Sequence, residues 1–133
     1  MPELYTFDYA IIRVVPRVER EEFINSGVIL SCPARQFLKA RTELNAQRLA
    51  AFAPQLVAET IQGYLDTISI ICDGGAEAGA IGQLPQRGRF HWLVAPRSTI
   101  IQTSPVHSGF CAAPEAALEH LLEKMVRLDT NQA

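Results

Sequence analysis

The stretch from Phe7 to Val15 constrains the fold most, because it is apolar on both of its alternating faces. Ile11 and Val15 point one way in an extended chain, and Ile12 and Val14 point the other way. A strand of this kind is buried on both sides, so we expect it at the centre of a sheet.

Arg13 interrupts this apolar strand. A buried guanidinium without a partner is costly, so Arg13 needs a carboxylate or a path to water. It lies near the expected end of the strand. Two interpretations therefore stay open: the side chain reaches solvent there, or it takes part in binding.

Three further strands and three helices follow from hydrophobic periodicity. Residues 25–27, Asn-Ser-Gly, tolerate a turn or bulge and lead into the second strand. The expected strands are 28–32, 36–42 and 99–104, and the expected helices are 46–52, 54–72 and 114–128. Residues 89–94 fit either a helical turn or a strand, and Trp92 within them is expected in the core.

These elements predict one α+β domain over residues 1–133. Its antiparallel sheet has about four strands in the order 3-2-1-4, covered on one face by two to three helices. The core is expected to contain the apolar positions that share the strand and helix periods: Ile11, Val14, Val28, Leu30, Ile61, Leu65, Ile68, Leu118 and Leu122.

Composition excludes several classes of protein. The 12 basic and 14 acidic residues argue against a general nucleic-acid binder, which is usually strongly basic. Cys32, Cys72 and Cys111 have irregular spacing and predict neither a disulfide framework nor a zinc site. No signal peptide or transmembrane run is apparent, so a cytoplasmic protein without membrane association is expected. No motif calls for a metal or another cofactor.

One long segment, between Glu77 and Glu115, contains no acidic residue but several arginines and histidines. Its middle is rich in donors that suit a carboxylate or phosphate. We therefore predict an anion-binding patch formed by Arg97, Ser98, Thr99, Gln102 and His107, with Arg13 on the neighbouring strand. The alternative is a solvent-facing edge strand on which Arg97 and His107 make only local pairs.

Catalytic constellations are weak in this sequence. A nucleophile reading would combine Ser104 or Ser108 with His107 and Asp8, yet no Gly-x-Ser-x-Gly elbow is present. A metal site would need His91, His107 and His120 without a supporting motif.

Two segments resemble a bacterial family called domain of unknown function 3037. They are residues 8–28, which include Asp8 to Arg17 and Glu22 to Val28, and residues 81–107, which include Ile81 to Pro85 and Ala95 to His107. The resemblance implies a small bacterial protein whose gene tends to lie beside genes for HipA-like kinase-fold proteins. It supplies no catalytic residue.

Three functions remain from these observations. The first is a non-enzymatic accessory or interaction subunit that associates with itself or with a protein partner, such as a HipA-like kinase. The second is a small hydrolase or nucleotide-processing enzyme that uses the Arg97 to His107 segment. The third is a nucleic-acid-associated module, which the mild acidity disfavours.

Overall fold

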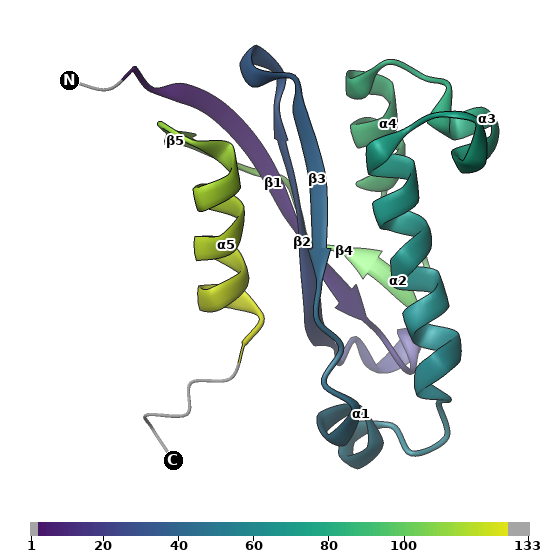
Figure 1. Ribbon diagram of the computed structural model, residues 1–133. Helices are drawn as coiled ribbons and strands as arrows, with labels where there is room; N and C mark the ends of the chain where they lie inside the picture. Colours follow the sequence, from purple (N-terminus) through teal and green to yellow (C-terminus); the bar gives the residue numbers. More distant parts are fainter. Residues whose placement is uncertain (1–2, 128–133) are drawn as a thin grey trace.

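A computed structural model describes residues 3–127 and contains a five-stranded antiparallel sheet with helices against it (Figure 1). The strands are β1 (Tyr5–Val14), β2 (Ile24–Cys32), β3 (Phe37–Thr42), β4 (Ile101–Thr103) and β5 (His107–Cys111). The helices are α1 (Ala46–Phe52), α2 (Ala58–Asp73), α3 (Gly79–Gly82), α4 (Gln86–Leu93) and α5 (Pro114–Met125). None of these helices is long and apolar enough to cross a membrane.

The strand order is β3-β2-β1-β4, which confirms the α+β class and the predicted order. The long strand β1 is central: β2 pairs with one of its edges, and β4 and β5 share the other. β4 pairs with the carboxyl-terminal part of β1, and β5, which was not predicted, pairs with residues Tyr5 to Tyr9. The register of β1 and β2 shifts between Ile12 and Arg13, opposite the predicted bulge.

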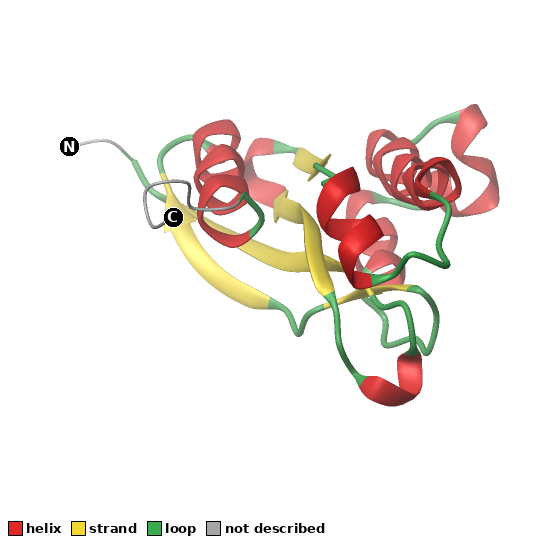
Figure 2. Ribbon diagram, turned by 90° about the horizontal axis from the view of Figure 1, so that it is seen from below, coloured by secondary structure: helices red, strands yellow, loops and turns green. Residues whose placement is uncertain are grey.

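Helices lie on both faces of the sheet rather than on one (Figures 1 and 2). On one face α1, α2 and α4 cover Ile12 and Val14; on the other, α5 covers Phe7 and Ile11. The physical reason lies in β1 itself, because a strand that is apolar on both faces needs a cover on each. The sheet therefore separates two hydrophobic clusters.

The predicted core is confirmed, with one position only partly buried. Ile11, Val28, Leu30, Leu118 and Leu122 belong to the α5-side cluster. The α2-side cluster contains the others: Val14, Ile61 and Leu65, with Ile68 half-buried at its edge.

Several element boundaries differ from the prediction. α2 begins at Ala58 rather than Pro54, because residues 53–56 form a separate turn in which the Leu56 amide donates to the Ala53 carbonyl. β4 begins at Ile101 rather than Thr99. The Thr99 hydroxyl donates to the Ile101 carbonyl, and the side-chain amide of Gln102 donates to the Thr99 carbonyl. These two hydrogen bonds close a turn before the strand. The ambiguous residues 89–94 lie mostly in α4.

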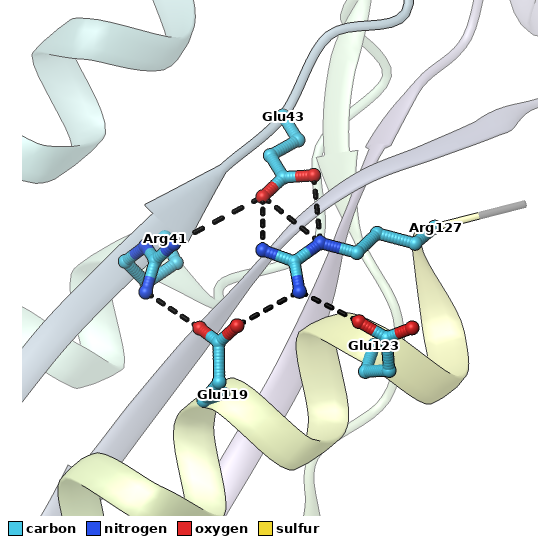
Figure 3. Close-up of polar contacts among 5 residues, drawn as sticks. All are labelled: Arg41, Glu43, Glu119, Glu123 and Arg127. Carbon is cyan, nitrogen blue, oxygen red and sulfur yellow. Dashed lines mark hydrogen bonds and ion pairs between the residues drawn. The ribbon is translucent and has the colours of Figure 1, made fainter.

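An ion-pair network fixes the end of α5 to the end of β3 (Figure 3). Arg127 Nη2 lies 2.6 Å from Glu43 Oε2, and Arg127 Nη1 lies 2.8 Å from Glu119 Oε1 and 2.6 Å from Glu123 Oε2. Arg41 Nη1 reaches Glu119 Oε2 at 2.7 Å. We call these five residues the Arg127 network. Hydrogen bonds from Arg127 are the main reason that the pKa of Glu43 lies below its usual value.

Candidate functional site

The loop between α4 and β4 contributes residues to two hollows. They lie on opposite faces of the sheet, because Ile101 lines one, Gln102 lines the other, and neighbouring residues of a strand face opposite sides. The first, which we call the Trp92 groove, has a volume of about 560 Å³ and lies between α2, the end of α4 and the start of β4. Its lining is mostly apolar: Tyr64, Thr67, Ile68, Ile71, Trp92, Leu93, Arg97, Thr99, Ile100 and Ile101.

Helix α2 supplies one wall of the Trp92 groove through Tyr64, Ile68 and Ile71. Residues at this spacing share one face of a helix, which explains why they meet in one wall. Trp92 is at the end of α4, where the helix turns into the loop. It is 40% exposed and Tyr64 is 49% exposed, so the groove presents two large aromatic side chains to solvent. The expectation that Trp92 lies in the core is therefore wrong, because the side chain is exposed and belongs to neither hydrophobic cluster.

Arg97 lies at the edge of this groove with its guanidinium 4.3 Å from the centre of the Trp92 ring. Its Nη1 donates to the Leu93 carbonyl at 3.2 Å, and its Nη2 donates to the Trp92 carbonyl. These carbonyls belong to the last turn of α4, where a cation is stabilised by the helix dipole. Arg97 thus closes the helix and remains a fixed positive charge beside the aromatic ring.

The second hollow, which we call the Arg13 cleft, has a volume of about 450 Å³. It combines the end of β1, the connection from β1 to β2, the loop before β4 and β4 itself. Its lining residues are Arg13, Val15, Val18, Glu21, Phe23, Ser98 and Gln102.

Arg13 is half-buried in this cleft, and its guanidinium carbon lies 4.0 Å from the centre of the Phe23 ring. Within residues 3–127 its Nε has no hydrogen-bond partner although it is buried, and no carboxylate lies within 4.0 Å of the guanidinium. Gln102 is its neighbour across the β1–β4 pair. Asn25, the β2 neighbour, uses its amide group to bond the Met125 carbonyl.

The structure divides the predicted patch instead of assembling it. Arg97 and Thr99 line the Trp92 groove, whereas Ser98 and Gln102 line the Arg13 cleft on the other side. His107 lies in β5 and pairs with Tyr9 of β1, and the centres of their two rings are 5.5 Å apart.

The β1 partners of His107 and Gln102 are Tyr9 and Arg13, which are four positions apart. This corresponds to about 13 Å at the rise of a strand. The cluster that the structure does form joins Arg13 with Ser98 and Gln102.

The residues considered for nucleophilic catalysis are also dispersed. The Ser104 side chain is buried. Its hydroxyl oxygen accepts a hydrogen bond from the backbone N–H of Ile11 at 2.8 Å, and its O–H donates to the Pro105 carbonyl. Ser108 donates to Asp8 at 2.5 Å, but neighbouring residues of a strand face opposite sides, so His107 points away from this pair. In the described part of the chain, no group of three His, Cys, Asp or Glu side chains could hold a metal ion.

Sequence reasoning missed two aromatic residues that shape the hollows, Tyr64 and Phe23. Tyr64 fits the apolar face of α2 and Phe23 lies in a charged connector, so neither position carries a local signal for a binding surface. Only the fold brings Tyr64 to Trp92 and Phe23 to Arg13.

Comparison with known proteins identifies one family. The family described as "Protein of unknown function (DUF3037)" matches residues 9–126, which is most of the chain and includes every residue of both hollows. No curated protein and no solved structure gives a significant match.

Proposed function

We propose that this chain, which belongs to the DUF3037 family of proteins of unknown function, is an accessory subunit that binds another protein through the Trp92 groove. The partner proposed is a HipA-like kinase-fold protein of the same bacterial cytosol, the neighbour implied by the family resemblance. The observation that carries the proposal is the pair of half-exposed aromatic side chains, Tyr64 and Trp92, over an apolar floor.

Aromatic residues and arginine dominate the binding energy of protein interfaces. Buried aromatic anchors contribute most when they are surrounded by contacts that exclude water. The groove has this composition, because Ile68, Ile71 and Ile100 line it together with the two aromatic rings. A partner segment with apolar side chains would therefore gain energy by covering them.

Arg97 defines the polar part of the proposed interface. Its guanidinium is held by two carbonyls and the Trp92 ring, so little side-chain entropy remains to be lost on binding. Two of its five N–H groups are occupied by those carbonyls. The remaining donors suit an acidic side chain of the partner, which we propose to lie beside the apolar anchors.

The experiment is a calorimetric titration of the chain with its purified HipA-like neighbour. We expect Trp92→Ala and Tyr64→Ala each to weaken binding by tenfold or more, because truncating a central aromatic anchor costs about 2 kcal/mol or more. Phe110→Ala is the matched control, since Phe110 is an aromatic side chain of β5, is 72% exposed and lies outside the groove. Circular dichroism checks that each variant is folded.

The proposal is wrong if the wild-type chain forms no complex with this neighbour. It is equally wrong if folded Trp92→Ala binds as tightly as wild type, or if Phe110→Ala weakens binding as much as the groove variants do.

A further inference from the structure

We infer that the Arg13 cleft is a separate binding site for a monocarboxylate with a small apolar body. The cleft contains a guanidinium that the described part of the fold leaves without a polar partner, and it lies apart from the Trp92 groove. The inference does not depend on the proposed protein partner.

The other partly buried arginines of the described chain all have polar partners, unlike Arg13. Arg89 donates to the carbonyls of Leu84, Ile71 and Cys72, and Arg127 lies among three carboxylates. Arg97 donates to two carbonyls. Arg13 has only an aromatic ring. An incoming anion would supply the partner that these other guanidinium groups already have.

The cleft also places this guanidinium against an aromatic ring. Arg13 projects from the central strand, and Phe23 lies against its charged group at 4.0 Å. Gln102 is the neighbour of Arg13 across the strand pair, and its side-chain amide donates one N–H to the Thr99 carbonyl, so the second N–H remains for a carboxylate. Ser98, which is exposed, adds a hydroxyl to the lining. The planar fork of donors on a guanidinium suits the two oxygens of a carboxylate.

The charges that line the cleft limit an anionic ligand to one negative charge. Arg13 is the one cation among the lining residues and Glu21 is the one acid. Glu21 is exposed and lies beyond ion-pair distance of Arg13, so it leaves the fork open while adding negative potential. A phosphate dianion would meet too little positive charge here, whereas a carboxylate matches a single guanidinium.

The remaining lining residues determine the body of the ligand. Val15, Val18 and Phe23 form an apolar wall beside the polar group. A carboxylate with a short aliphatic chain would bury that chain against them. Such a group is offered by a free short-chain acid and by the terminal carboxylate of a peptide that ends in an aliphatic residue.

The experiment follows backbone amides by nuclear magnetic resonance while the full chain is titrated at constant ionic strength. N-acetyl-leucine is the probe, and N-acetyl-leucinamide is its uncharged counterpart. We expect saturable shifts at Ser98 and Gln102 with the acid and none with the amide. Short peptides ending in Leu, compared with free isovalerate, distinguish the two sources of the carboxylate.

Variants separate recognition from general charge. Arg13→Gln should weaken binding of N-acetyl-leucine tenfold or more, and Arg13→Lys should weaken it less because the charge remains without the fork. Arg48→Gln, which removes an exposed arginine of α1, should change nothing. Glu21→Gln should strengthen binding about two- to threefold by removing a like charge, and it lies in an exposed turn where it disturbs no core contact.

Three results would overturn the inference. The first is equal binding of the acid and the amide, and the second is an effect of Arg48→Gln as large as that of Arg13→Gln. The third is the absence of saturable shifts up to about 10 mM acid, which corresponds to a binding free energy weaker than about 3 kcal/mol. If Arg13→Gln does not fold, Glu21→Gln and Arg13→Lys still decide between these outcomes.

Discussion

Leu122→Ala should lower the free energy of unfolding by about 3–5 kcal/mol. The Leu122 side chain is fully buried between α5 and the sheet, in the cluster with Phe7, Ile11, Val28 and Leu30. Large-to-small substitutions at such sites cost about 2–5 kcal/mol, depending on how far the surroundings can close the cavity. The Arg127 network ties the end of α5 to β3, which limits that closure and places the expected cost in the upper part of the range.

The assay is urea unfolding followed by circular dichroism, with Met125→Ala as the control on the same helix. Met125 is 39% exposed, so its truncation should cost less than about 1 kcal/mol. A loss of less than about 1 kcal/mol for Leu122→Ala, or equal losses for both variants, would refute the α5-side cluster.

Leu65→Ala tests whether the two clusters are independent. Leu65 is fully buried on the opposite face of the sheet, so the two losses should add within about 0.5 kcal/mol in the double variant. A markedly smaller or larger sum would show that the faces are coupled.

Three other predictions concern glycine positions, acid stability and thiol reactivity. Gly109→Ala should destabilise the chain by about 1–3 kcal/mol, because its new Cβ would lie 2.8 Å from a ring carbon of Phe7. Gly63→Ala, in open space on α2, should instead stabilise the chain by about 0.5–1 kcal/mol. The midpoints of urea unfolding test both. Arg127 lowers the pKa of Glu43 in the folded chain below its ordinary value of 4.5. The stabilisation from this pair is therefore complete above pH 4.5 and is lost as the pH falls through the lower pKa of the folded state. In Arg127→Gln, the free energy of unfolding should depend less steeply on pH below pH 4.5. Burial raises the pKa of Cys72 to about 12, so a thiol reagent at pH 8 should label it only after denaturation, and rapid labelling of the folded chain would contradict its burial.

The strand order could be predicted because its main signal is local. The two apolar faces of residues 7–15 place β1 at the centre, and the charges of β3 place that strand at an edge. A strand that is apolar on both faces also requires helices on both sides of the sheet. The prediction that helices cover one face of the sheet overlooked this consequence. β5 was missed because His107, Ser108 and Gly109 give it little apolar alternation.

The candidate sites could be predicted only in part. Arg13 stood out because a charge interrupts an apolar strand, and the structure gives it no carboxylate among the described residues. The donors around Arg97 were assumed to act together because they are close in sequence. In the fold, Arg97 and Thr99 turn to one hollow while Ser98 turns to the other, so closeness in sequence does not produce a single patch.

The central claim is that the Trp92 groove is the surface that contacts a protein partner. The most direct measurement records amide and indole N–H signals of the isotope-labelled chain while the proposed partner, an unlabelled HipA-like kinase-fold protein, is added. We predict that the largest changes occur at the Trp92 indole and at the amides of Tyr64, Ile68 and Ile100, which line the groove. Changes confined to β5 around Phe110, with an unaffected Trp92 indole, would contradict the claim.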